Sequence, residues 1–455
     1  MDAADLRDRI DGELFEPDGA GYEDARSIFN AMIDRRPALI AQCESEADVG
    51  AALAHAREHE LEVAIRSGGH SVTGASLTDG GIVIDMRRMN SVSVDPSART
   101  ATAQGGATWS DFDRATQPHG LLTTGGRVST TGVAGLTLGG GSGWLERKFG
   151  LACDSLESVT LITADGRQVT ASESENPDLF WALHGGGSNF GVATELVFRL
   201  RPLPAVTFGL LLWPADAGPE VGRRYRELFE AGAPEELGGA FAYITGPPEE
   251  FVPSELRDEL VSGVVLVYAG GLDEAREAIG PILELDPVGL MPTEMPYAEI
   301  QSAIDDPPGY RNYWSAEHLA SLPDEALEIF CRRAEDMVVP SPSQHILFPW
   351  GGALNAQGDE WPIPHRDAPW VAHPLGLWED PADDEQAKAW ARGLCTDLRP
   401  YSTGAVYLNF ESASEQRLEE GFGSENLGRL AAVKGEYDPD NVFHLHHNIK
   451  PLQPA

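Results

Sequence analysis

Short runs in which apolar and polar residues alternate fill much of the first 200 positions and predict a sheet-rich region. Apolar residues spaced three and four apart predict a helix that begins at Ser45, with Asp48 completing a capping box. The expected strands are short and are bounded by turn residues, and they cover 37–43, 63–67, 81–86, 91–95, 99–106, 159–166 and 167–172. The last two form a hairpin around Asp165 and Gly166.

The pattern changes after Arg201 and Pro202, where longer amphipathic helices alternate with strongly apolar strands. The helices are expected at 217–231, 272–284, 323–336 and 384–397, and the strands at 207–213, 263–269 and 344–352. This order predicts an α+β domain in which helices cover one face of an antiparallel sheet. The proline-rich stretch 361–374 is expected to be a surface loop.

The last part of the chain predicts a compact segment that returns to complete the first domain. It carries VYLNF, a helix over 425–438, and FHLHHN, which is interpreted as a strand. In a strand, His444 and His446 share one face while His447 points away, and no carboxylate partner is evident, so we expect no metal site. The expected division is 1–205, 206–400 and 401–455.

The composition is strongly acidic, with 33 basic and 72 acidic residues and a formal net charge of −39. Such self-repulsion is weakened by salt, so we interpret the chain as adapted to a salt-rich cytoplasm. The acidic composition also argues against nucleic-acid binding, because no basic patch is present that could neutralise the phosphates of a nucleic acid. The four cysteines are far apart and form no CxxC pair, which argues against a zinc cluster or a disulfide framework.

Membrane insertion and export are also not expected. The longest apolar run, 260–271, is too short to cross a bilayer, and the acidic first residues carry no export signal. We therefore expect a soluble, cytoplasmic protein.

Three glycine clusters carry the candidate chemistry: SGGHSVTG at 67–74, GLTLGGGSG at 135–143 and HGGGSNFG at 184–191. Consecutive glycines let backbone N–H groups converge on an anion, which suits a pyrophosphate. A nicotinamide-binding fold would need G-x-G-x-x-G directly after the first strand, and that spacing is missing. By itself the first cluster leaves open whether His70 is a metal ligand, a base, an attachment point or an ordinary turn residue.

Read in order, these segments resemble the FAD-linked oxidases of the berberine-bridge-enzyme type, in the vanillyl-alcohol-oxidase superfamily. The resemblance is carried by RSGGHS, DGGIVIDM, GVAGLTLGGGSGWL, FGLACDSL, LFWALHGGGSNFGVAT, YLNF and DPDNVFHLHHNIKP. It covers about 37–200 and 401–451, whereas the middle third is similar only through GYRNYWS at 309–315. It implies a two-part PCMH-type FAD-binding domain with an inserted α+β substrate domain, an antiparallel sheet covered by helices.

In this family the histidine of the RSGGH turn carries FAD covalently, and His70 falls on that position. Many members add a second link from a cysteine, but Val128 stands at the matching position here and has no nucleophile. The resemblance therefore implies FAD held by a single covalent link through His70, as in the hydroxynicotine-oxidase branch. A single link implies small rather than polymeric substrates.

The resemblance also implies roles for other residues. Tyr407 is a candidate catalytic base if a neighbouring cation lowers its pKa, with a purely orienting role as the alternative. Thr131 lies near the flavin ring, at a position that influences access of dioxygen. The other expected cofactor-binding residues are Arg66, Ser67, Gly68, Gly69 and Ser71 in the pyrophosphate loop, then Gly132, Gly135, Gly139, Gly140, Gly141, Gly143, Asn409, His447 and Asn448. Cys153 is expected to be a small buried side chain rather than a redox group.

The predicted function is hydride transfer from a small alcohol, sugar or amine to FAD, with dioxygen as the expected electron acceptor. Two alternatives keep the same cofactor. One is a dehydrogenase of this fold that passes electrons to another acceptor, and the other is a flavin-binding protein without turnover.

Overall fold

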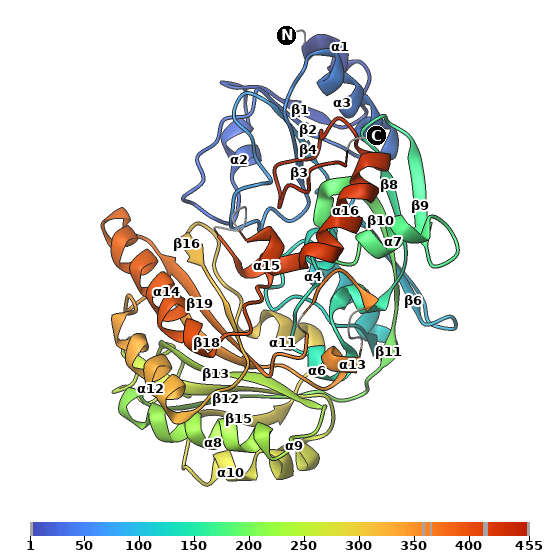
Figure 1. The fold of residues 1–455 in the computed structure, drawn as a ribbon. Helices are drawn as coiled ribbons and strands as arrows, with labels where there is room; N and C mark the ends of the chain where they lie inside the picture. The colour runs from blue at the N-terminus through green and yellow to red at the C-terminus, as the bar shows by residue number, and fades with distance from the viewer. Residues whose placement is uncertain (1–2, 357–359, 365, 413–416, 453–455) are drawn as a thin grey trace.

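Three larger β-sheets, one two-stranded sheet and the helices around them make up the described part of the chain, from the N-terminal sheet at one end to the largest sheet at the other (Figure 1). The computed structural model describes residues 3–356, 360–364, 366–412 and 417–452. Besides those discussed below, the smaller elements are α1 (Ala3–Arg7), α2 (Tyr22–Arg26), β7 (Leu121–Leu122), β11 (Arg201–Pro202) and α13 (Ala353–Ala356).

The first sheet has the order β1–β2–β4–β3, from β1 (Glu13–Phe15), β2 (Leu39–Gln42), β3 (Val63–Arg66) and β4 (Ile82–Asp85). The strand β4 is parallel to both β2 and β3, and all four of its residues are buried. The helix α3 (Glu46–Glu58) follows β2, and the Ser45 side chain accepts a hydrogen bond from the Asp48 backbone, which confirms the predicted cap.

The second sheet is antiparallel and has the order β5–β6–β10–β8–β9. Its strands are β5 (Val92–Asp95), β6 (Thr100–Gln104), β8 (Leu156–Ile162), β9 (Gln168–Ser172) and β10 (Val192–Arg199). The pairing of β8 with β9 confirms the predicted hairpin. Around this sheet pack the short helices α4 (Trp109–Thr116), α5 (Val133–Leu138), α6 (Glu146–Phe149) and α7 (Pro177–Ala182).

The third sheet is antiparallel and has eight strands, in the order β15–β12–β14–β13–β18–β19–β16 with β17 paired to β19. The strands are β12 (Thr207–Pro214), β13 (Leu237–Thr245), β14 (Leu260–Tyr268), β15 (Val288–Glu294), β16 (Arg311–Trp314), β17 (Glu317–Leu319), β18 (Gln344–Pro349) and β19 (Trp370–Trp378). Alternation along β12 separates its two faces: Leu211 packs in a cluster with the outer helices, whereas Leu210 and Leu212 pack in the core shared with the second sheet.

The helices α8 (Gly218–Glu230), α9 (Leu272–Ala278), α10 (Gly280–Leu283), α12 (Asp324–Arg333) and α14 (Asp384–Leu398) contribute apolar residues to the outer cluster. Figure 1 shows α8, α9, α10 and α12 below the large sheet. The predicted α+β domain with helices on one face is therefore confirmed, although the helix expected at 272–284 is interrupted at Ile279. The remaining helix, α11 (Tyr297–Ala303), lies near α4 instead.

The prediction of a surface loop at 361–374 is wrong. Arg366 and Ile363 are buried, and β19 already begins at Trp370. The reason is a tertiary ion pair, because the guanidinium of Arg366 lies 2.7 Å from a carboxylate oxygen of Asp154, far away in the sequence.

The C-terminal segment returns to the first two sheets, as the red trace among the blue and green elements shows (Figure 1). After α15 (Leu418–Phe422), α16 (Ser424–Tyr437) places the buried ammonium group of Lys434 within 2.6 Å of the Asn189 carbonyl and 2.7 Å of the Phe443 carbonyl. The hydrogen bond from Lys434 to Asn189 ties the C-terminal segment to the N-terminal part of the chain, which fits the expected two-part first domain. The exact boundaries at 205 and 400 stay a prediction.

Residues 441–450 form no strand, so that part of the prediction is wrong. His447 has a left-handed backbone with φ of 46°, which interrupts an extended chain. The side-chain amide of Asn189 instead donates to the carbonyls of His446 and His447, each at 3.3 Å, and so fixes an irregular path.

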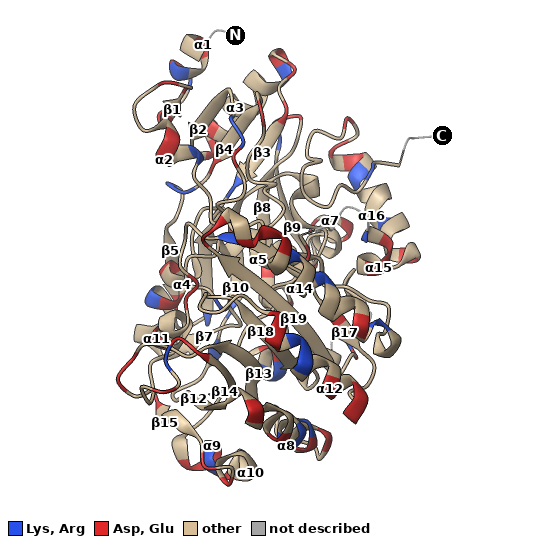
Figure 2. Cartoon of the chain, turned by 90° about the vertical axis from the view of Figure 1, so that its left-hand side faces the viewer, with Lys and Arg blue, Asp and Glu red and all other residues tan. Residues whose placement is uncertain are grey.

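Acidic residues lie on elements throughout the molecule rather than in one segment (Figure 2). None of the described helices is both long and apolar enough to cross a bilayer.

Candidate active site

A cavity lies where the first two sheets, the inner face of the third sheet and the C-terminal segment meet. Its wall includes parts of the three glycine clusters, around Gly69, Gly135 and Gly187, together with residues near Asn409 and His447. Segments that are far apart in the sequence therefore converge on one site.

The turn after β3 forms one wall of this cavity, through Ser67, Gly68, Gly69 and Ser71 around His70. Gly69 has φ of 75°, a conformation that favours glycine. Gly68 packs so closely on the neighbouring loop that an added Cβ would lie 2.3 Å from the backbone nitrogen of Gly132.

Arg66 is not among the residues that line the cavity, and its expected place in the pyrophosphate loop stays a prediction. Its buried guanidinium donates instead to the carbonyl oxygens of Ala25 and Ser27. Arg66 therefore holds the preceding loop against the turn.

His70 lines the cavity and is held on several sides. Its ring stacks on Phe29 with centroids 4.1 Å apart, and its Nε2 lies 2.9 Å from the hydroxyl of Thr130. Its Nδ1 lies 3.4 Å from the hydroxyl of Thr131. Burial, with a smaller contribution from the charge of Arg66, lowers the pKa of His70 to about 3. The imidazole is therefore neutral at physiological pH, so one of its ring nitrogens carries no proton and keeps its lone pair.

The second glycine cluster is divided between the cavity and the core. Thr131, Gly132 and Gly135 line the cavity, as expected. The later glycines are not among the lining residues, and their expected contact with the cofactor stays a prediction; they are Gly139, Gly140, Gly141 and Gly143. They permit close packing instead, since a Cβ on Gly141 would lie 2.4 Å from the Cβ of Ala152.

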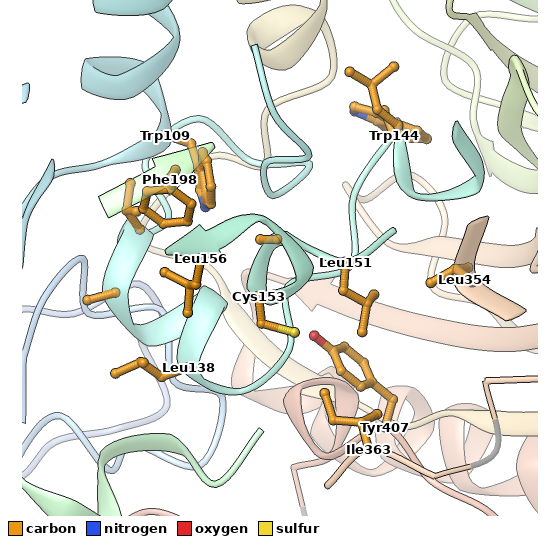
Figure 3. Close-up of a cluster of buried hydrophobic side chains, with 14 of the residues drawn as sticks. Trp109, Leu138, Trp144, Leu151, Cys153, Leu156, Phe198, Leu354, Ile363 and Tyr407 are labelled. Carbon is orange, nitrogen blue, oxygen red and sulfur yellow. The ribbon is translucent and has the colours of Figure 1, made fainter. Parts of the chain in front are cut away.

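Tyr407 also lies behind the cavity wall, in the buried cluster with Cys153 and Ile363 (Figure 3). Its oxygen accepts hydrogen bonds from the backbone nitrogens of Gly141 at 2.7 Å and Ser142 at 3.2 Å. Burial raises the pKa of Tyr407 to about 12, against the opposing effect of these donors. The geometry therefore disagrees with a base of lowered pKa and supports the orienting alternative. Cys153 is fully buried, as expected.

On the C-terminal side, Asn409, His446 and His447 line the cavity, whereas Asn448 does not. The amide of Asn409 donates to the Tyr407 oxygen at 3.0 Å. Both ring nitrogens of His447 are buried and find no hydrogen-bond partner in the part of the chain that the structure describes.

These unpartnered groups test whether the cavity suits FAD. Among the described residues, no group hydrogen-bonds the buried hydroxyls of Ser67 and Ser76 or the ring nitrogens of His447, all of which border the cavity. Buried polar groups are normally paired, so polar atoms of a ligand are the natural partners here. The cavity therefore suits FAD, a dinucleotide with a flavin ring, because its wall combines a glycine turn, a neutral histidine and unpaired polar side chains.

The opposite wall comes from the third sheet and was missed by the sequence analysis. Alternate residues of β18 face the cavity, namely Gln344, Ile346 and Phe348. The adjacent strand β19 adds His373 and Leu375. This wall is largely apolar. The sequence marks this segment only as a strand, through the apolar run 346–348.

Three charged side chains on the cavity wall were also missed, Arg127, Asp306 and Glu411. Burial raises the pKa of Asp306 to about 7, with a contribution from neighbouring Asp305, and raises the pKa of Glu411 to about 7 against the effect of Arg417. Nothing in the sequence distinguishes these buried acids from the other acidic residues.

Outside the cavity, His55, Glu58 and His59 bring possible metal-ligand atoms within 4.8 Å of one another. Glu58 already pairs with Arg9 at 3.3 Å, and a guanidinium next to the cluster opposes a second cation. The C-terminal histidines form no such group among the described residues.

Comparison with known proteins decides the family. An FAD binding domain matches residues 37–172, and a berberine and berberine-like domain matches residues 406–450. The (R)-6-hydroxynicotine oxidase of Paenarthrobacter nicotinovorans is 32% identical over 97% of each chain. The chain belongs to the FAD-linked oxidoreductases of the berberine-bridge-enzyme type. It is also 29% identical, over 98% of each chain, to an uncharacterised FAD-linked oxidoreductase of Bacillus subtilis strain 168.

Solved structures agree with this placement of the oxidoreductase. The crystal structure of 6-hydroxy-D-nicotine oxidase from Arthrobacter nicotinovorans has a TM-score of 0.86 and 29% identity, covering 97% of this chain and 98% of that one. Physcomitrella patens BBE-like 1 has a TM-score of 0.88 at 21% identity over the whole of both chains, which shows the shared fold. The expected PCMH-type fold with an inserted α+β domain is therefore confirmed.

Proposed function

We propose that this FAD-linked oxidoreductase oxidises a small amine or alcohol, with FAD attached through His70 and dioxygen as electron acceptor. The observation that carries the proposal is the neutral, cavity-lining imidazole of His70 beside the glycine turn. When bound, FAD supplies the acceptor for the hydride that leaves the substrate carbon.

One wall of the cavity is assigned to the cofactor, and the opposite wall is assigned to the substrate. Ser67, Gly68, Gly69 and Ser71 hold the pyrophosphate, and Asn409 and His447 border the flavin from the C-terminal side. The apolar wall of β18 and β19 excludes water from the substrate. Such a wall suits a small, largely apolar substrate better than a sugar, whose many hydroxyls would need partners.

With FAD in the cavity, an imidazole nitrogen of His70 would be the attachment point for the methyl carbon of the flavin. The imidazole and the methyl group would each give up one hydrogen, and dioxygen would be the two-electron oxidant, reduced to hydrogen peroxide. Val128 lines the cavity and offers no nucleophile, which supports a single link.

Thr131 supports dioxygen as the acceptor, because it is a small residue that lines the cavity next to His70. The acidic surface supports a salt-rich cytoplasm as the location.

The test is to mix the purified protein, without oxygen, with a panel of small amines and alcohols and to follow its visible flavin absorption. We expect at least one compound to bleach the flavin, and admission of air to restore the colour with one peroxide for each substrate oxidised. Analogues whose reacting carbon carries no hydrogen serve as controls. Bleaching without peroxide on admission of air would favour a dehydrogenase, and a flavin that no compound bleaches would favour a binding protein.

A further inference from the structure

Most of the charge in the cavity wall is already balanced by neighbouring side chains. Arg127 pairs with Glu146 at 2.7 Å and lies over the ring of Phe348 at 4.0 Å. Glu411 pairs with Arg417 at 3.0 Å and accepts the backbone N–H of Ala316 at 2.9 Å. Neither charge is free to recognise a charged ligand.

Asp306 is different. It is buried after the end of α11, lines the cavity, and accepts one hydrogen bond, from the amide of Gln344 to its Oδ1 at 2.6 Å. Within residues 3–356, 360–364, 366–412 and 417–452, no basic side chain pairs with it and nothing donates to its Oδ2. The neighbouring Asp305 adds negative charge and is itself held by the backbone N–H of Ser129 at 2.6 Å.

A buried carboxylate without a cationic partner is costly, and a ligand cation is the complement that removes this cost. The raised pKa of Asp306 follows from the same surroundings, with burial as its main cause. Beside Gln344, the partner of Asp306, the cavity wall is apolar: Leu375 lies opposite Gln344 on β19, and Trp314 lies opposite Leu375 on β16. The pocket thus combines one unpaired acid with a surface for a hydrophobic body.

We infer that Asp306 is the residue that selects a cationic amine with an apolar body as substrate and accepts the proton that leaves its nitrogen. This inference rests on the function proposed above, of which it names the substrate class. Gln344 is a positioning residue, because its amide fixes one carboxylate oxygen and leaves the other without a donor among the described residues.

The chemistry balances. The proton on the substrate nitrogen goes to Oδ2 of Asp306, and the hydrogen on the adjacent carbon leaves with its electron pair as a C=N bond forms. Bound FAD would be the acceptor of that hydride. Water hydrolyses the iminium ion to a carbonyl compound and ammonium. The proton on Asp306 and the hydride equivalent leave with dioxygen as hydrogen peroxide.

Binding can be measured apart from turnover with a matched pair of compounds. Cumylamine is a benzylic ammonium with no hydrogen on the carbon next to nitrogen, and cumyl alcohol is its neutral counterpart. Titration calorimetry at about pH 8, where the amine is protonated and Asp306 is ionised, compares both compounds on wild type and on Asp306→Asn. Glu299→Gln is the control, since it removes an exposed negative charge from α11, the helix that precedes Asp306.

We expect wild type and Glu299→Gln to bind the amine about tenfold or more tightly than the alcohol, and Asp306→Asn to lose that preference. The inference would be overturned if the wild type bound the two compounds equally or did not bind the amine. It would also be overturned if Asp306→Asn kept the preference for the amine. The visible flavin spectrum of each sample reports separately on the proposed cofactor, so failure of one proposal is distinguished from failure of the other. Gln344→Leu should weaken the amine preference without abolishing it.

Discussion

The phenol oxygen of Tyr407 accepts a hydrogen bond from the backbone nitrogen of Gly141, 2.7 Å away, across 266 positions of the sequence. The contact joins the C-terminal segment to the second glycine cluster, behind the cavity. It makes Tyr407 a structural link between the two parts of the flavin domain.

Replacement of Tyr407 by Phe should therefore reduce stability more than chemistry. Two backbone N–H groups, of Gly141 and Ser142, lose their acceptor, which costs about 1–3 kcal/mol each when a donor stays buried and unpaired. Urea unfolding measures the loss, and stopped-flow bleaching of the flavin measures the chemistry. Tyr437→Phe, which loses a weaker contact at 3.3 Å to Asn176, is the control. A fall of the bleaching rate by about a hundredfold or more, with stability unchanged, would instead identify Tyr407 as the base.

Arg366→Met should be strongly destabilising. It leaves the Asp154 carboxylate buried without its cation, and breaking such a pair costs about 3–5 kcal/mol. The free energy of unfolding in urea at constant high salt measures this. Arg7→Met removes the exposed pair with Glu16, so its cost should be about 1 kcal/mol or less. Equal effects of the two substitutions would mean that the Arg366 pair does not stabilise the domain contact.

The carboxyl of Asp306 should also make stability depend on pH. Its pKa in the folded protein is raised to about 7, above the value of about 4 expected in an unfolded chain. The folded state therefore holds this proton more tightly, so the contribution to stability is fully present below about pH 4 and is lost as the pH rises through about 7.

Asp306→Asn removes that dependence. Its melting temperature relative to wild type should be close to unchanged at about pH 4 and higher at about pH 8. Glu411 titrates in both proteins, so its effect cancels in the difference. A variant that is less stable than wild type at the higher pH would show that Asp306 is already paired with a cation.

Salt should stabilise the protein because of its net charge of −39. The Debye length falls from about 10 Å at 0.1 M to about 3 Å at 1 M, so repulsion between exposed carboxylates weakens. The melting temperature should rise between about 0.1 M and about 2 M KCl, and a neutral osmolyte at equal osmolality is the control. A melting temperature that stays flat or falls with KCl would contradict adaptation to salt.

Much of the fold could be predicted because local patterns decided it. The strands around β3 and β4 alternate or are uniformly apolar, and Ser45 caps α3 with its own side chain. The predictions failed where distant contacts decide the structure. Arg366 is buried only because Asp154 receives it, and the path of His447 depends on the amide of Asn189.

Part of the candidate site could be predicted from the sequence, and part of it could not. The turn at His70 has a distinctive local sequence, so its place on the cavity could be read directly. Asp306 could not, because its importance lies in burial and in the absence of a partner cation among the described residues. The chain has 72 acidic residues, and sequence alone does not indicate which of them are buried.

The covalent tether at His70 is tested most directly by the flavin that stays with the denatured chain. The protein is unfolded in acid and run on a denaturing gel under ultraviolet light, and the intact mass is measured. His446→Ala is the matched control, because it removes another histidine from the cavity wall. If FAD is attached through His70, wild type and His446→Ala show fluorescence and a mass increase of one FAD. His70→Ala then shows no fluorescence and no mass increase. Freely extractable FAD from the wild type, or a tether retained in His70→Ala, would contradict this attachment.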